Sequence, residues 1–153
     1  MRRKDKEITD KQMMEKILDE AQVIRIAMVD NGEPYLVAMN FAYTDGALYM
    51  HSAREGRKID ILKKNSKVAF QADTGVELLI ENEACGCSTR YMSVFGTGKA
   101  FLIEDKAGKT DALDAIMKKH TGRDGFAYPE KVFDRTLAIK VEIESMTGKK
   151  SGY

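Results

Sequence analysis

The sequence predicts an α+β, mainly β fold: a small antiparallel β-barrel flanked by two or three helices. The pairs Asn31-Gly32 and Asp45-Gly46 are hairpin signals that join consecutive extended stretches. Strands joined by such tight turns are antiparallel, because parallel neighbours need long crossover connections. Gly96 and Gly98 interrupt a long extended run, which is typical of the bulges that close barrels. Apolar residues at helical spacing elsewhere in the chain indicate the flanking helices.

The first half of the chain begins with a helix predicted over Asp10–Ala21. Thr9 and Gln12 have the spacing of a capping box, and Ile8 with Met13 fits a hydrophobic staple around it. The residues predicted to face inward are Met14, Ile17, Leu18 and Ala21. Three strands of an antiparallel meander follow, at Val23–Val29, Tyr35–Tyr43 and Ala47–Ser52.

A short helix over Gly56–Lys64 leads into the second half of the chain. The strands predicted there are Val68–Ala72, Val76–Ile80 and Tyr91–Ile103. A full helix is predicted over Lys109–His120, and its inward-facing residues are Ala112, Leu113, Ile116 and Met117. The last strand, Thr136–Glu144, alternates apolar residues at 137, 139, 141 and 143 with Ala138, Lys140, Glu142 and Glu144. One of its faces should therefore be buried and the other hydrated.

Composition narrows the class of protein. The chain has 153 residues and a mass of 17.2 kDa, so a single domain over residues 1–153 is predicted. Lys and Arg number 25 against 24 Asp and Glu, and a net charge of +1 provides no broad basic field for nucleic acid or an anionic membrane. No apolar run approaches a membrane span, and the charged first residues do not resemble a signal peptide. Two cysteines are too few for a disulfide framework, so a cytoplasmic protein is predicted.

Two apparent motifs do not meet the requirements of the chemistry they suggest. Gly108-Lys109-Thr110 resembles the end of a P-loop, but Ile103 stands where that motif requires a glycine. Cys85-Gly86-Cys87 has no second cysteine pair, and both histidines are remote in sequence, so no metal site is predicted. Neither nucleotide hydrolysis through a P-loop nor zinc binding is therefore expected.

The segment at the end of the third strand has the composition of an anion site. The strand ends in His51-Ser52-Ala53, and a helix is predicted to begin near Gly56. The positive end of a helix dipole and its free backbone N–H groups attract anions. Ser52 can donate a hydrogen bond, Arg57 can chelate a phosphate with two N–H groups, and Lys58 supplies a point charge. The composition alone leaves the alternative open that Arg57 and Lys58 are a solvated first turn.

Several motifs, in their order and spacing, resemble a known family. They are Pro34-Tyr35-Leu36-Val37-Ala38-Met39-Asn40-Phe41, Asp45 to Ala53, Gly56-Arg57-Lys58, Tyr91-Met92-Ser93-Val94 with Gly96 and Gly98, and Thr147-Gly148-Lys149. Together they span about Ile8 to Lys149. The sequence resembles the flavin-binding split-barrel superfamily, and within it is most similar to the nitroimidazole-resistance (Nim-type) proteins, relatives of pyridoxamine 5′-phosphate oxidase.

The resemblance implies a split β-barrel that forms a homodimer and binds FMN at two sites in the subunit interface. It implies that the polar edge of the flavin ring lies along the backbone of Leu36, Val37, Ala38 and Met39. It also implies that the ribityl chain and phosphate contact His51, Ser52 and Ala53, with the phosphate held by Arg57 and Lys58. A neighbouring strand would contribute Ser93 and Val94.

The sequence departs from the family pattern at two points. Ala38 replaces a proline that is common in the Nim-type motif. The chain also has no tryptophan and lacks the tryptophan- and arginine-rich tail of true pyridoxamine 5′-phosphate oxidases, so oxidation of a B6 vitamer is not expected.

The function implied by the resemblance is a flavin-dependent reductase of small aromatic or nitro compounds. The flavin would carry out the electron chemistry, so no catalytic triad is needed. His51 is the candidate catalytic residue, because an imidazole with an ordinary pKa near 6.5 can donate a proton. The alternatives are that His51 only hydrogen-bonds the backbone or the cofactor, and that the protein binds flavin without catalysis. A small-molecule substrate or electron donor is the expected partner besides a second subunit.

Overall fold

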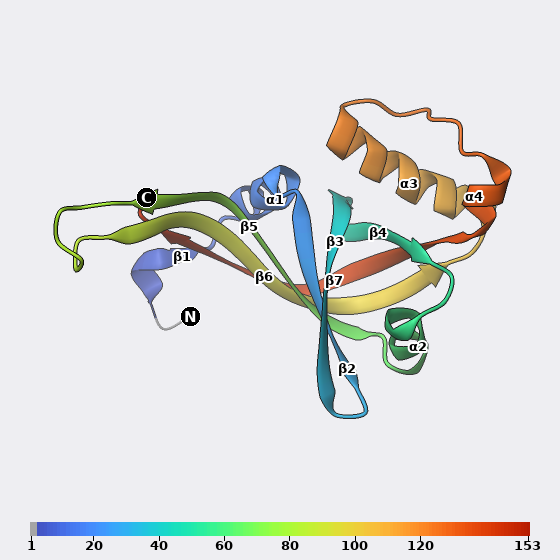
Figure 1. Ribbon diagram of the computed structural model, residues 1–153, viewed down its shortest axis with the longest axis horizontal. Helices are drawn as coiled ribbons and strands as arrows, with labels where there is room; N and C mark the ends of the chain where they lie inside the picture. Colours follow the sequence, from blue (N-terminus) through green and yellow to red (C-terminus); the bar gives the residue numbers. More distant parts are fainter. Residues whose placement is uncertain (1–2) are drawn as a thin grey trace.

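Seven strands form one antiparallel sheet in the order β1-β7-β4-β3-β2-β5-β6, and β6 also pairs with β7 (Figure 1). This additional pairing closes six of the strands into a barrel, which confirms the predicted fold class. The computed structural model describes residues 3–153. The strands are β1 Glu7–Ile8, β2 Val23–Asp30, β3 Glu33–Thr44, β4 Ala47–Ala53, β5 Lys67–Leu79, β6 Ser88–Ile103 and β7 Thr136–Ser151.

The helices lie outside the barrel and on its ends. They are a short 3₁₀ turn at Lys4–Lys6, α1 Lys11–Glu20, α2 Arg57–Lys64, α3 Lys106–Thr121 and α4 Glu130–Asp134. The predicted inward face of α1 is confirmed, because Met14, Ile17, Leu18 and Ala21 are buried. In α3, Ala112 and Ile116 are buried, while Leu113 and Met117 are half-buried. None of the helices in residues 3–153 is long and apolar enough to cross a membrane.

The predicted cap of α1 is wrong in detail. Asp10, not Thr9, is the N-cap residue, and its carboxylate accepts a hydrogen bond of 2.9 Å from the backbone N–H of Gln12. Met13 is exposed, whereas Ile8 is buried in β1, where it pairs with Gly148 of β7. Ile8, which local spacing assigned to the start of the helix, is therefore part of the sheet.

Three strand predictions also need correction. The two strands predicted over Val68–Ala72 and Val76–Ile80 are one strand, β5, with an irregular register between Thr74 and Glu77. The last strand runs on to Ser151, because its second half pairs with β6. Its expected hydrated face is partly covered: Ala138 is fully buried beside β4 and β6, on a strand that α3 also contacts.

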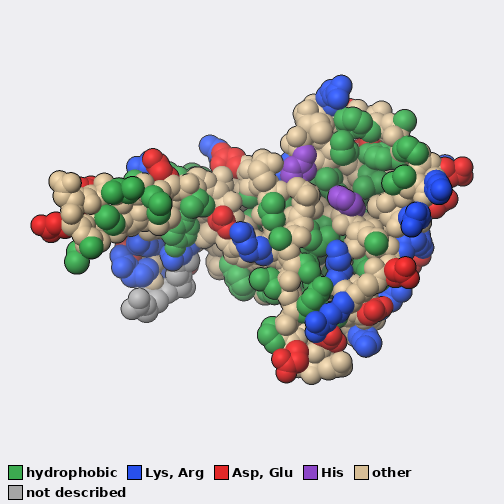
Figure 2. Space-filling view, in the orientation of Figure 1, with side chains coloured by type: hydrophobic (Ala, Val, Ile, Leu, Met, Phe, Trp, Pro, Cys, Tyr) green, Lys and Arg blue, Asp and Glu red, His purple; other side chains and the backbone are tan. Residues whose placement is uncertain are grey.

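The second half of β5 and the beginning of β6 form an arm that projects from the barrel (Figure 1). Its large exposed apolar side chains are Val76, Leu78 and Ile80, and Figure 2 shows hydrophobic side chains along it. Both free cysteines, Cys85 and Cys87, lie exposed in the connection at its tip.

Candidate functional site

The barrel is open between β3 and β4. These two strands pair from Thr44↔Ala47 only as far as Phe41↔Met50. Beyond that point β3 continues with β2 alone, and β4 continues with β7 alone, at His51↔Ala138 to Ala53↔Thr136. Figure 1 shows β4 running toward α2 while the β2–β3 hairpin projects away from it. We call the opening the β3–β4 split.

The split leaves two unpaired strand edges facing each other. The edge of β3 covers residues 33–40, which include the predicted cofactor contacts Leu36, Val37, Ala38 and Met39. The edge of β4 covers three other predicted contacts, His51, Ser52 and Ala53. Unpaired edges present free backbone N–H and C=O groups. The residues predicted to hold the polar edge of the flavin ring therefore lie where β3 has no neighbouring strand on one side.

Side-chain alternation along β3 gives the split one apolar wall. Met39 and Phe41 point into the barrel and are buried, whereas Leu36 is 62% exposed and Ala38 is exposed on the opposite face. A planar ring lying along this edge would therefore meet backbone polar groups, with apolar side chains above and below it.

The amino-terminal end of α2 lies after β4, next to the split. Its N-cap is Gly56, with φ of 117° and no capping side chain, so the first backbone N–H groups of the helix receive no hydrogen bond from a cap. Ser52 is buried, and its hydroxyl forms no side-chain hydrogen bond within residues 3–153. The β4 side of the split therefore carries hydrogen-bond donors from both Ser52 and the first turn of α2.

Lys58 is a half-buried cation that forms no ion pair with any described residue. Its stem lines a small apolar void of about 10 Å³ together with Met39 and Met50. This burial lowers the pKa of the Lys58 ammonium from its ordinary 10.5. An anion bound beside it would compensate for the lost hydration.

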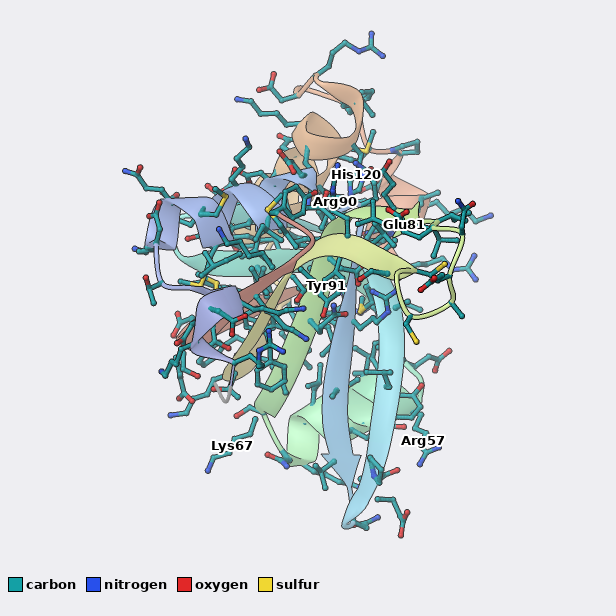
Figure 3. All side chains as sticks on the ribbon, turned by 90° about the vertical axis from the view of Figure 1, so that its left-hand side faces the viewer. Arg57, Lys67, Glu81, Arg90, Tyr91 and His120 are labelled. Atoms are coloured by element: carbon teal, nitrogen blue, oxygen red, sulfur yellow. The ribbon has the colours of Figure 1, made fainter. Side chains whose placement is uncertain are left out.

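Arg57 already has partners in this structure. Its Nε donates a hydrogen bond of 3.1 Å to Asp30, and its guanidinium lies 4.6 Å from the centre of the Tyr35 ring. Figure 3 shows Arg57 beside the β2–β3 hairpin. Arg57 thus ties α2 to the hairpin. Its side chain is still 57% exposed, so its remaining N–H groups are accessible.

His51 lies on the outer face of β4. Partial burial of the ring lowers the pKa of His51 from its ordinary 6.5, and the charges of Lys58 and His120 lower it further. His120, at the end of α3, is held by a contact of 3.2 Å between its Nε2 and the carbonyl oxygen of Phe41. Figure 2 shows both histidines on one face of the molecule. At pH 7 His51 is therefore mainly a neutral imidazole.

A hollow of about 400 Å³ surrounds the end of β4. It is lined by His51, Ser52, Ala53, Val132, Arg135 and Thr136. The last three residues were not predicted as site residues. Arg135 brings a further cation to the hollow, and only the pairing of β7 with β4 places it there. No local sequence pattern predicts the pairing of β4 with β7.

Comparisons with known proteins identify the family of this chain. The family model described as pyridoxamine 5′-phosphate oxidase matches residues 10–150. This chain belongs to the pyridoxamine 5′-phosphate oxidase family. The family predicted from the sequence is therefore confirmed. No curated protein matches the sequence significantly.

Solved structures give the family assignment more detail. A candidate 5-nitroimidazole antibiotic resistance protein from Bacteroides thetaiotaomicron is 37% identical, with a TM-score of 0.84, over 94% of this chain and 86% of that one. An FAD-binding protein from Mesorhizobium loti is 25% identical, with a TM-score of 0.68, over 94% and 96% of the two chains. An FAD- and heme-binding protein from Mycobacterium smegmatis shares the fold, with 21% identity, a TM-score of 0.83, and coverage of 97% and 74%.

Two predicted residues of the pyridoxamine 5′-phosphate oxidase motif lie away from the split. Ser93 and Val94 are in β6, and Val94 is fully buried. Gly148, the partner of Val94, lies eleven positions further along β7 than Leu137, the partner of Ser52. At about 3.3 Å per residue this is a path of about 36 Å along the strand. Figure 1 likewise shows the beginning of β6 on the left and α2 on the right. The register of β7 thus places Ser93 and Val94 far along the sheet from Ser52.

Proposed function

We propose that the protein binds FMN in the β3–β4 split and acts as a flavin-dependent reductase of small aromatic or nitro compounds. The observation that carries the proposal is the pair of unpaired strand edges ending at the half-buried, unpaired Lys58. FMN needs this combination: polar edge contacts for its ring and a cation for its phosphate. The 37% identical Bacteroides protein, with its described role in 5-nitroimidazole resistance, supports the substrate class.

Each proposed contact uses groups described above. The backbone of Leu36, Val37, Ala38 and Met39 would hold the ring edge, and the proposed contacts of the ribityl chain and phosphate are His51, Ser52, Ala53, Arg57 and Lys58. Bound FMN would supply the electron chemistry, taking two electrons from a donor such as a reduced nicotinamide and passing them, with two protons, to a nitro group that becomes a nitroso group and water. His51 would hold a proton near the acceptor.

Non-catalytic flavin binding is the second candidate. The lowered pKa of His51 favours it, because a neutral imidazole is a weak proton donor at pH 7. Both candidate functions place FMN in the β3–β4 split. They differ only in whether the bound flavin reduces a substrate.

The visible spectrum of the protein as purified tests the proposal. We expect a flavin absorption band, and mass analysis of the released chromophore should identify FMN. After anaerobic reduction by a nicotinamide donor, addition of a 5-nitroimidazole should reoxidise the flavin. Colourless protein that takes up no FMN contradicts the proposal. Bound FMN that no acceptor reoxidises supports the non-catalytic alternative, and released FAD contradicts the choice of cofactor.

We further propose that the functional unit is a homodimer with the cofactor at the subunit interface. Since the register of β7 places Ser93 far along the sheet from the split of its own chain, a second subunit would supply it, and Val94 is fully buried behind that position. The exposed side chains Leu36, Phe95 and Phe101 provide apolar surface on β3 and β6 for such a contact. Sedimentation equilibrium with FMN present should give twice the chain mass of 17.2 kDa. A mass of one chain would contradict the dimer and leave FMN binding to be judged separately.

A further inference from the structure

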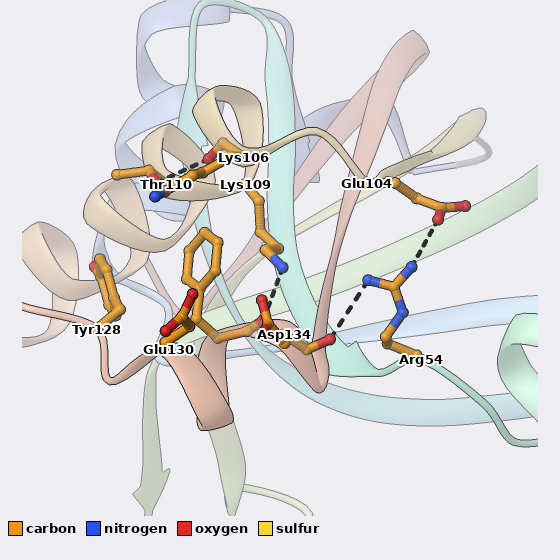
Figure 4. Close-up of a pocket in the computed structure, with 9 residues that line it drawn as sticks. Arg54, Glu104, Lys106, Lys109, Thr110, Tyr128, Glu130 and Asp134 are labelled. Carbon is orange, nitrogen blue, oxygen red and sulfur yellow. Dashed lines mark hydrogen bonds and ion pairs between the residues drawn. The ribbon is translucent and has the colours of Figure 1, made fainter.

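A second hollow, larger than the one around His51, lies apart from the β3–β4 split. It has a volume of about 630 Å³ and lies between α3, α4 and the residue that follows β4 (Figure 4). The residues that line it are Arg54, Glu104, Lys106, Lys109, Thr110, Tyr128, Glu130, Phe133 and Asp134. Helix α4 separates it from the hollow around His51, because Val132 and Arg135 line that other hollow. We call it the α3–α4 pocket.

A buried lysine forms part of its wall. Lys109 is only 3% exposed. Its Nζ donates hydrogen bonds of 2.7 Å to the carbonyl oxygen of Phe133 and 3.2 Å to that of Thr136. The same Nζ lies 3.9 Å from the centre of the Phe133 ring. These contacts hold the ammonium at a fixed place in the pocket wall.

The charge of Lys109 has no carboxylate partner in the part of the chain that the structure describes. Lysine is rarely buried without a paired anion, because removing its charge from water is costly. Its two carbonyl partners use two of its three N–H donors and leave the third. Two other basic residues line the pocket: Arg54 is already bound to Glu104 at 2.7 Å, and Lys106 is exposed to solvent. Lys109 is therefore the buried cation that an anion in the pocket would compensate.

The rest of the pocket restricts the class of anion. Tyr128 and Phe133 form an aromatic wall, with ring centres 6.0 Å apart. The Tyr128 hydroxyl donates to Asp114 at 2.7 Å, so that side chain is held in place. Glu130 and Asp134 also line the pocket, and their negative charges oppose a doubly charged ligand such as phosphate. A single carboxylate on a flat apolar body satisfies all three conditions.

We propose that the α3–α4 pocket is a second ligand site, which binds a small aromatic monocarboxylate through Lys109. The carboxylate takes the free N–H of Lys109, and the ring lies against Tyr128 and Phe133. This site is independent of the flavin proposal and goes beyond it.

Titration of isotope-labelled, FMN-saturated protein with benzoate, followed by NMR, tests the proposal. We expect saturable shifts of the backbone amides of Thr110, Phe133 and Asp134, with the FMN absorption unchanged. Benzamide has the same shape without the charge and should bind at least about tenfold more weakly. Equal affinity for the two compounds overturns the proposal, as do shifts confined to His51–Ala53 with release of FMN.

A pair of variants tests whether the charge of Lys109 binds the carboxylate. Lys109→Met keeps the length of the stem and should weaken benzoate binding at least about tenfold. Lys118→Met removes an exposed lysine of the same helix, paired with Asp124, and should leave benzoate affinity unchanged. Unaltered benzoate binding in Lys109→Met overturns the proposal. If that variant does not fold, the ratio of benzoate to benzamide affinity in the wild-type protein decides the question.

Discussion

Replacing Gly98 with alanine should lower the free energy of unfolding by more than about 3 kcal/mol, an effect at the upper end for a single added methyl group. A Cβ at this position would overlap the carbonyl oxygen of Glu142 and come within 3.0 Å of Val141 Cγ1. Neither neighbour can move easily, because both belong to β7 at the seam that closes the barrel. Gly98 also stands at the register shift of that seam. Urea unfolding followed by circular dichroism measures the change.

Gly122→Ala is the matched control for this effect. Gly122 ends α3 with φ of 74°, and a Cβ there meets nothing within 4 Å. Its substitution should cost about 1 to 2 kcal/mol, from the left-handed backbone alone. A Gly98→Ala protein that is as stable as the Gly122→Ala protein would show that the seam is not the constraint described above.

The parts of the fold that could be predicted from the sequence are those specified by neighbouring residues. Asn31-Gly32 and Asp45-Gly46 each hold both central residues at positive φ, with values of 52° and 90°, and of 50° and 78°. This is the type I′ turn that such pairs favour, and it fixes the β2–β3 and β3–β4 connections. The barrel closure at Gly98 was also predictable, because only a glycine permits so close an approach of two strands.

The parts that could not be predicted depend on contacts between distant segments. The second half of β7 contains Gly148 and several polar residues, and it is a strand because β6 pairs with it. The split opens where β4 leaves β3 after Met50, and nothing in the local sequence marks that point. The burial of Lys109 could not be predicted either. Its sequence position, at the start of a helix, is typical of a surface lysine, but α4 and β7 bury it. The motif resemblance located the residues of the candidate site, whereas the geometry gave the reason for their position.

Lys58→Glu should weaken FMN binding at least about 30-fold, because loss of a desolvated partner of a charge typically costs 2 kcal/mol or more. The side chain is half-buried beside the split and has no ion pair within residues 3–153 that would share the effect. Fluorescence quenching of FMN during titration with protein measures the affinity. Lys118→Glu changes the net charge equally at an exposed position and should leave the affinity unchanged. Equal loss in both variants would indicate a general effect of charge.

Riboflavin and pH separate a phosphate contact from a structural role of Lys58. Riboflavin has the same ring without the phosphate, so wild-type protein should prefer FMN and Lys58→Glu should lose most of that preference. Burial lowers the pKa of Lys58 in the free protein below 10.5, and a bound phosphate should raise it again. FMN affinity should therefore fall as the pH rises through the free-state pKa, since a neutral amine attracts no phosphate. In Lys58→Gln this decrease in affinity should be absent, because no titrating group remains at that position. If the Lys58 variants keep both the preference for FMN and the decrease in affinity at alkaline pH, Lys58 does not bind the phosphate. The phosphate site would then be Arg135 or the remaining N–H groups of Arg57.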